Sequence, residues 1–163
     1  MLKNVVNTIR RNHALEHATI TLMLAEQGPM RVVGRAGTDG FHVYANVTRE
    51  KLELFARQAL ERLQRGEASL AVSPLCGTNI AVGGILAGAA SYLAIGSSRK
   101  GGFDAVAHAI IAGMLGVMAS QPLGRIVQKN YTTSPDLDGV RIVSVEPVGN
   151  GRFGVHKVRT AAS

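Results

Sequence analysis

Two apolar segments that follow one another in the chain place the strongest limit on how it can fold. Gly77–Gly96 contains no charged residue, and Phe103–Leu123 contains only Asp104 near its start. Each is close to the ~20 residues that an α-helix needs to cross a hydrocarbon core of ~30 Å. A soluble protein of 163 residues would need most of its remaining chain to cover two such helices on all sides. We therefore expect both segments to cross a lipid bilayer.

The two segments are predicted to form a helical hairpin. The linker Ser97–Gly102 is short, so the helices must be antiparallel neighbours. Small residues four positions apart favour close helix packing, and we expect them at the interface of the hairpin. They are Gly84 with Gly88 in the first segment and Ala109 with Gly113 in the second.

Basic residues predict the orientation of the hairpin and exclude one class of partner. The linker holds Arg99 and Lys100, whereas more cations flank the other ends of the helices: Arg57, Arg62, Arg65, Arg125, Lys129 and Arg141. The positive-inside bias then predicts a multi-pass protein of the bacterial inner membrane with both termini in the cytoplasm. The net charge of +7 comes with no Trp and few aromatic residues, which favours anionic lipid headgroups over nucleic acid. The single cysteine excludes an internal disulfide.

The rest of the chain reads as a small cytoplasmic domain of the α+β class, into which the hairpin is inserted. Its parts are residues 1–73 and 125–163, and the hairpin with its flanks is 74–124. Alternating apolar residues predict strands, and the 3.6-residue period predicts helices. We expect helices over 1–27 and 48–66, with Thr48 as the cap of the second, and strands over 31–35, 41–47, 69–73, 140–148 and 153–159. Asp39-Gly40 and Gly149-Asn150-Gly151 are the predicted hairpin turns.

The first predicted helix carries the motif His13-Ala-Leu-Glu16-His17. Histidines four positions apart lie one above the other on a helix, so both imidazoles can bind one metal ion. Glu16 is on the same side and is the candidate general base. The His-x-x-Glu-His order is similar to that of the inverzincin metallopeptidases, such as the pitrilysin-like enzymes, which implies zinc-dependent peptide hydrolysis. Those enzymes also use a downstream acidic ligand that has no clear match in this chain.

The motif lies on the apolar side of its helix, in line with Leu2, Val6 and Ile9. Burying polar side chains without partners costs ~1–3 kcal/mol each. A zinc ion would compensate for this cost. The alternative is a network of hydrogen bonds from the histidines and Glu16 to backbone groups or to Asn79.

Zinc needs at least a third protein ligand. Cys76, in Ser73-Pro-Leu-Cys-Gly-Thr-Asn79 where the chain reaches the hairpin, is the first candidate. It is equally a candidate for a small buried apolar residue. Four further residues stay open as ligands, of which the two histidines alternate with apolar neighbours and are expected on an exposed sheet face: His42, His156, Asp136 and Asp138.

His108 lies inside the second apolar segment, where an ionisable residue is a candidate functional group. A simple hairpin places it opposite Ser91, which predicts a hydrogen bond between the two helices. The alternative is an axial ligand for a haem or a chlorophyll-type pigment.

Three features together resemble a family of small bacterial membrane proteins that carries only a domain-of-unknown-function label. They are Arg11-Asn-His-Ala-Leu-Glu-His-Ala18, Ser73–Asn79 with its Cys-Gly-Thr-Asn, and the apolar hairpin that follows. The resemblance covers most of the chain and implies occurrence in photosynthetic and related bacteria. It implies the same architecture and no particular activity.

Two functions follow from these observations. The first is a membrane-anchored zinc-dependent hydrolase, with His13 and His17 as ligands, Cys76 as a further ligand and Glu16 as the base. The second is a non-catalytic accessory subunit of a larger membrane complex, in which the His/Glu cluster is structural and His108 holds a haem or pigment. Association of two copies through Gly84 and Gly88 is a third expectation.

Overall fold

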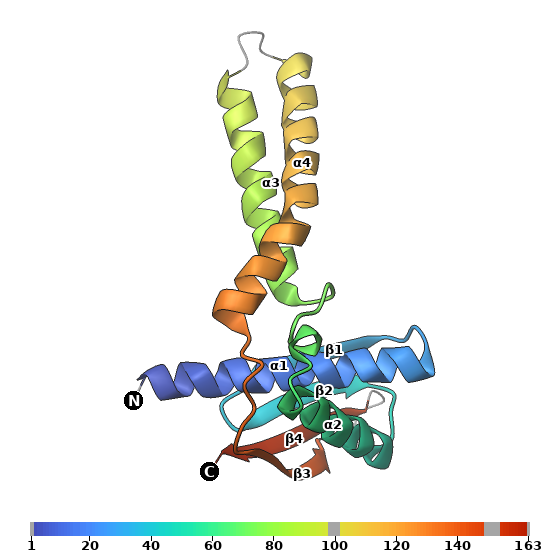
Figure 1. Ribbon diagram of the computed structural model, residues 1–163. Coiled ribbons are helices and arrows are strands. Elements are labelled where there is room, and N and C mark those ends of the chain that lie inside the picture. Colours follow the sequence, from blue (N-terminus) through green and yellow to red (C-terminus); the bar gives the residue numbers. More distant parts are fainter. Residues whose placement is uncertain (1, 98–101, 149–153, 163) are drawn as a thin grey trace. The chain divides into compact units, whose positions relative to one another are not determined.

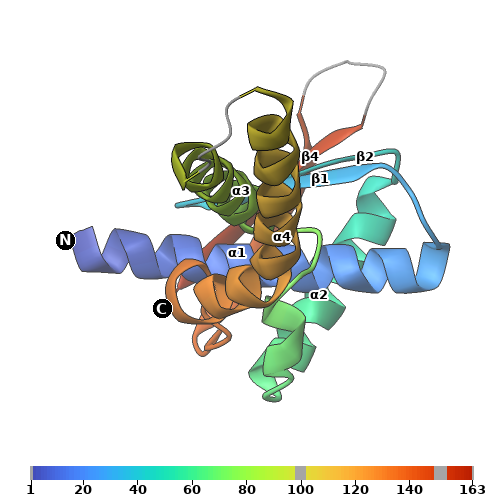
Figure 2. The same ribbon diagram turned by 90° about the horizontal axis from the view of Figure 1, so that it is seen from above.

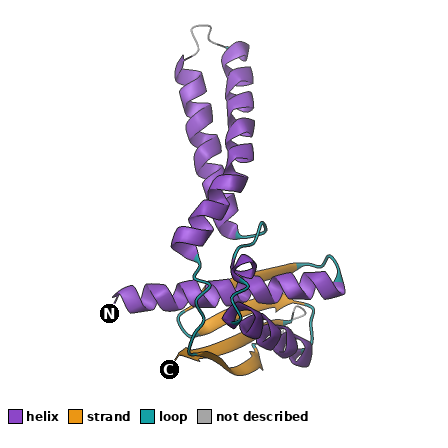
Figure 3. Ribbon diagram, in the orientation of Figure 1, coloured by secondary structure: helices purple, strands orange, loops and turns teal. Residues whose placement is uncertain are grey.

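The computed structural model describes residues 2–97, 102–148 and 154–162. In this part of the chain the fold is α+β, with four α-helices and a four-stranded antiparallel sheet. The chain divides into two compact units, which we call the sheet domain (Met1–Ser73 with Lys129–Ser163) and the hairpin (Pro74–Gln128). All strands belong to the sheet domain (Figures 1 and 3). The expected Arg99-Lys100 linker and Gly149–Gly151 turn lie outside the described residues.

The helices of the sheet domain begin and end close to the predicted residues. Helix α1 is Leu2–Gln27 and ends at the predicted residue, and α2 is Arg49–Gln64. Thr48 caps α2, because its hydroxyl accepts a hydrogen bond from the Lys51 amide at 3.4 Å. The predicted strand over residues 69–73 is wrong: Ala68–Ala71 is a short 3₁₀ helix, η1. The alternation of apolar and polar residues in this segment is too short to distinguish a strand from one turn of helix, and here one turn of helix buries Ala71.

The sheet has the strand order β1-β2-β4-β3, with all neighbours antiparallel. Strands β1 and β2 form the predicted hairpin around Asp39-Gly40, and Gly40 has a φ of +129° that favours glycine. A five-residue π-helical turn, η2 (Gln128–Thr132), precedes β3. The four strands are β1 (Val32–Gly37), β2 (Gly40–Ala45), β3 (Val140–Pro147) and β4 (Val155–Ala162).

One face of the sheet and the helices α1 and α2 enclose the hydrophobic core. Phe41 and Val43 of β2 and Val158 of β4 are fully buried on this face. Helix α1 contacts β1 and β2, while α2 contacts β3 and β4. The helices contribute small and branched apolar side chains to the same core: Ala14, Leu15, Ala18, Leu52, Phe55, Ala56, Ala59 and Leu63.

The two sheet histidines lie on opposite faces, because residues opposite each other in an antiparallel pair share a face. His156 pairs with Val43 and is 7% exposed on the core face, so its expected exposure is wrong. His42 pairs with Lys157 on the other face, where Asp39 accepts a hydrogen bond from Lys157 at 2.6 Å. Burial, and then the Lys157 charge, lower the pKa of His42 below its usual 6.5.

The free energy of unfolding of the sheet domain is expected to fall as the pH drops below 6.5, the usual His pKa. The unfolded chain then takes up a proton at His42 that the folded domain resists, so unfolding is favoured. Asp39 does not contribute to this pH dependence. Its hydrogen bond and ion pair with Lys157 lower its pKa, so the stabilisation that it provides is lost only below its usual pKa of 3.8. Denaturant unfolding at several pH values between 6.5 and ~4.5 should show a smaller pH dependence for His42→Gln than for the wild type. An unchanged dependence would contradict this assignment.

In the hairpin, α3 (Gly77–Ser97) packs against α4 (Phe103–Val127) through small residues. A Cβ on Gly83 would lie 3.2 Å from the Ser120 hydroxyl, and one on Gly116 would lie 2.7 Å from the backbone nitrogen of Ala87. The predicted use of Gly84 and Gly88 is wrong, because a Cβ on either would have no neighbour within 4 Å. The interface instead uses residues of α3 one position earlier in the sequence, Gly83 and Ala87.

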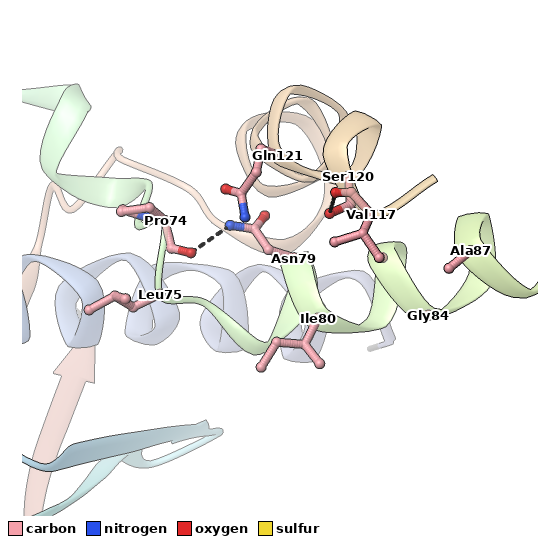
Figure 4. A pocket seen from close by; sticks show the side chains of 10 residues that line it. Pro74, Leu75, Asn79, Ile80, Gly84, Ala87, Val117, Ser120 and Gln121 are labelled. Carbon is pink, nitrogen blue, oxygen red and sulfur yellow. Dashed lines mark hydrogen bonds between the residues drawn. The ribbon is translucent and has the colours of Figure 1, made fainter. Parts of the chain in front are cut away.

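The outward faces of the hairpin are apolar. Of the residues of α3, Asn79 and Gly83 alone are buried, and exposed Ile, Leu, Val and Met side chains cover both helices. By length and composition, both helices are able to cross a membrane. An apolar groove of ≈ 530 Å³ lies between them, bordered by Ile80, Gly84 and Val117, whose positions can be followed in Figure 4.

Candidate metal centre

The structure brings His13 and His17 together on one side of α1. Their ring centroids are 4.3 Å apart with the ring planes inclined at 61°. A ring nitrogen of one lies within 4.8 Å of a ring nitrogen of the other. His17 is buried and His13 half-buried. This follows from their spacing, because side chains four residues apart overlie each other on a helix.

Backbone carbonyls orient both imidazoles. Nδ1 of His13 lies 2.9 Å from the Thr132 carbonyl oxygen, and Nδ1 of His17 lies 2.9 Å from the Ala71 carbonyl oxygen. A carbonyl can only accept a hydrogen bond, so each Nδ1 carries the proton. The lone pair of each neutral ring is then on Nε2. Metal-binding histidines have this arrangement, in which the hydrogen bond at the second nitrogen fixes the tautomer and the ring orientation.

A further contact of α1 fixes the segment that supplies the Thr132 carbonyl. The Arg10 guanidinium donates to the carbonyl oxygens of Asn130 and Thr133 at 3.0 Å each. The amide of Ser134 donates to the carbonyl of Arg10 at 3.0 Å. One turn of helix before His13, α1 therefore holds in place the chain segment that orients His13. These contacts connect residues more than a hundred positions apart, so the sequence carried no direct signal for them.

Glu16 is 6% exposed and lies against strand β1. A Cβ added to Gly34 would lie 1.9 Å from Oε1 of Glu16, so only glycine leaves room for this carboxylate. The sequence did contain a signal for the contact, because a glycine inside a strand often marks the close approach of another group. The carboxylate of Glu16 therefore extends toward the sheet.

A set of three potential metal ligands comprises His13 and His17 of the sheet domain and Cys76. Cys76 belongs to the hairpin, where it is 6% exposed and carries a free thiol. Its Sγ accepts a hydrogen bond from the Thr78 amide at 3.4 Å and lies 3.3 Å from the Thr78 hydroxyl. Cys76 thus directly precedes the first turn of α3.

The other predicted ligands are not part of this set. Asp136 forms an ion pair with Arg11 at 2.7 Å, which lowers the pKa of its carboxyl group. His42 and His156 lie on opposite faces of the sheet, as described above. Asp138 is exposed, and its backbone amide donates to the Asp136 carboxylate.

His108 does not bond across the hairpin as expected. It is exposed, and its Nδ1 lies 2.7 Å from the Asp104 carbonyl oxygen of its own helix. Ser91, its expected partner, donates instead to the Ala109 carbonyl at 2.8 Å. The hydrogen bond joins the two helices as predicted, but it does not involve the His108 side chain. The backbone carbonyl of Ala109, one residue further along the chain, faces α3 and accepts it.

Comparison with known proteins places these residues in a wider group. A family model described as Domain of unknown function (DUF6391) matches residues 8–145, which include the histidine pair, Glu16 and Cys76. An uncharacterized protein of Picosynechococcus sp. is 37% identical over an alignment of 98 residues, and the match covers 52% of this chain and 48% of the relative. The chain thus matches about half the length of this relative. No solved structure matches the chain.

Proposed function

The chain belongs to the DUF6391 family, and we propose that it is a membrane-anchored zinc-binding protein. The metal ligands in this proposal are His13, His17 and Cys76. Two nitrogens and one thiolate are a usual donor set for zinc, which accepts a further ligand at a fourth position.

The observation that carries the proposal is the state of the two imidazoles. Both have Nδ1 at 2.9 Å from a carbonyl oxygen, and both therefore offer Nε2 as a ligand. In a pair of core histidines that binds no metal, one ring could equally carry its proton on Nε2 and donate a hydrogen bond from there. Identical tautomers in adjacent rings instead favour a cation that accepts two lone pairs.

Chain connectivity supports Cys76 as the third ligand. Ala71, whose carbonyl orients His17, precedes Cys76 by five residues. Five residues span at most roughly 18 Å, so the thiol is tethered near His17 whatever path the chain takes. Besides the histidines, a cysteine is the strongest zinc ligand that a protein can offer.

The proposed anchor is the hairpin, with α3 and α4 as its membrane spans. Their largely exposed apolar surfaces support this assignment, because a helix in the core of a soluble protein is mostly buried. Lys129 and Arg125 near the end of α4 agree with termini in the cytoplasm. In a bacterium this membrane is the inner membrane.

Two finer functions are compatible with such a site. In the first, the protein is a hydrolase: the zinc ion supplies Lewis acidity and Glu16 accepts a proton as the base. In the second, zinc is structural in an accessory subunit of a larger membrane complex. The burial of Glu16 against Gly34 favours the second, because this contact uses the carboxylate within the sheet domain.

Metal analysis of the detergent-purified full chain tests the proposal. We expect about one zinc per chain in the wild type, and loss of most of it in His13→Ala, His17→Ala and Cys76→Ser. His156→Gln is the matched control, since it changes a buried histidine outside the proposed ligand set, and it should keep the zinc. With cobalt in place of zinc, a thiolate-to-metal absorption band should appear and should be absent in Cys76→Ser.

Glu16→Gln separates the two finer functions. A hydrolase is expected to keep its zinc and lose its turnover, whereas in an accessory subunit the substitution affects stability alone. A wild-type protein that neither carries zinc when purified without chelators nor binds added cobalt would overturn the proposal. Loss of metal in the histidine variants with full retention in Cys76→Ser would overturn the assignment of Cys76.

A further inference from the structure

The first turns of α1 extend beyond the strands of the sheet domain (Figures 1 and 2). The buried residues of this 26-residue helix begin at Asn12 and end at Met23. Before them, Leu2 is 78% exposed, Val5 40% and Val6 47%. Helical segments of this length are marginal in water unless one face is packed. The segment therefore presents apolar side chains that the sheet domain leaves exposed.

The three exposed apolar residues and the half-buried Ile9 form one stripe. Leu2, Val5, Val6 and Ile9 follow the spacing i, i+3, i+4 and i+7, which places them on one side of the helix. Asn4 and Asn7 occupy the opposite side. A helix with this division lies flat at a boundary between an apolar and an aqueous phase.

We propose that this stripe, Leu2 to Ile9, rests in the headgroup region of a bilayer that contains anionic lipids. The proposal assumes the membrane anchorage argued above. Charge agrees with it, because Lys3 borders the stripe and the first acidic residue of α1 is Glu16. Connectivity agrees as well, since Gly77, the first residue of α3, follows the sheet domain by only four residues. Such a short tether keeps the helix at a high effective concentration near the bilayer surface.

A second copy of the chain fits the stripe less well. A stable protein interface buries about 800 Å² on each partner, with some 20–30 residues on a side. Four aliphatic side chains on two turns of helix provide much less. A lipid surface has no such minimum, and each added apolar side chain strengthens the binding.

Tryptophan fluorescence in vesicles tests this inference, because the chain has no Trp of its own. We consider Val6→Trp on the stripe, Asn7→Trp on the polar side as its matched control, and Ile110→Trp on α4 as a monitor of the anchor. The full-length variants are placed in phosphatidylcholine–phosphatidylglycerol vesicles. Lipids brominated near the headgroup or deep in the chain are the quenchers, with acrylamide as the aqueous quencher.

We expect shallow brominated lipids to quench Val6→Trp by about twofold or more, with little quenching by acrylamide. Asn7→Trp should show the reverse, and Ile110→Trp should be quenched by the deep bromines. If the deep bromines quench Ile110→Trp but acrylamide quenches Val6→Trp, the inference about the stripe is overturned and the anchor assignment stands. A Val6→Trp shielded from both quenchers would show a protein partner on the stripe and also overturn it. Failure of Ile110→Trp to respond would overturn the anchorage itself.

Discussion

Replacing Gly40 with alanine is expected to open most of the sheet. A Cβ at this position would lie 1.9 Å from the carbonyl oxygen of Val158, and the backbone φ of +129° is itself unfavourable for alanine. Val158 is backbone of the neighbouring strand β4, so neither side can move without breaking the β2–β4 pairing. We expect a loss of roughly 3–5 kcal/mol, a large part of the stability of a small domain.

Hydrogen exchange measures this loss locally in the detergent-purified full chain. Amides of β2 and β4 should exchange at least about a hundredfold faster in Gly40→Ala than in the wild type. Gly66→Ala is the matched control, because Gly66 also has a positive φ, +92°, but no atom within 4 Å of an added Cβ. The control should lose only about 1 kcal/mol. If the two substitutions lowered the stability equally, the positive φ, and not the collision with Val158, would account for the loss.

Replacing Gly34 with alanine is expected to displace the Glu16 carboxylate, with which the new methyl group would collide. Glu16 is 6% exposed, so its side chain has little room to move away. Forcing an extra methyl group into a packed site costs about 1–3 kcal/mol, and we expect the upper end of this range because a buried carboxylate also loses its place. Hydrogen exchange of α1 and β1 reports the change.

A double substitution tests the stated cause. Once Glu16 is alanine, Gly34→Ala should cost far less, so the two changes are coupled by about 1 kcal/mol or more. Gly37→Ala in the same strand is the control, because the nearest atoms to its added Cβ are at 3.7 Å, an ordinary contact. Additive effects of Glu16→Ala and Gly34→Ala would contradict the predicted collision.

Much of the fold could be predicted from periodicity and turn residues. The two apolar helices, the helix of His13 and His17, the cap at Thr48 and the turn at Asp39-Gly40 all follow from local patterns. Apart from the expected strand over residues 69–73, where the chain forms a 3₁₀ helix, the predictions that failed depended on the rotation of an element or on its register. Helix α3 has two rows of small residues, and only the residues of α4 that face it decide that Gly83 and not Gly84 lies at the interface. In the same way, pairing with Val43 places His156 in the core.

The proximity of the two histidines was predictable, and the groups that surround them were not. A spacing of four residues is enough to predict that His13 and His17 meet. Their carbonyl partners, Thr132 and Ala71, are 119 and 54 positions away, and no local pattern marks a carbonyl group. Gly34 was the exception, since an isolated glycine in a strand can be recognised as a place of close approach.

The two carbonyl groups that orient the imidazoles lie close to where the chain leaves the sheet domain and to where it returns to it. Ala71 lies two residues before the chain leaves for the hairpin at Ser73, and Thr132 lies three residues after it returns at Lys129. A pull on either end of the hairpin therefore reaches one histidine ring within a few peptide units. If α3 and α4 cross a bilayer and the two histidines bind zinc, as we propose, a change in bilayer thickness would shift both rings and so alter the affinity for the metal.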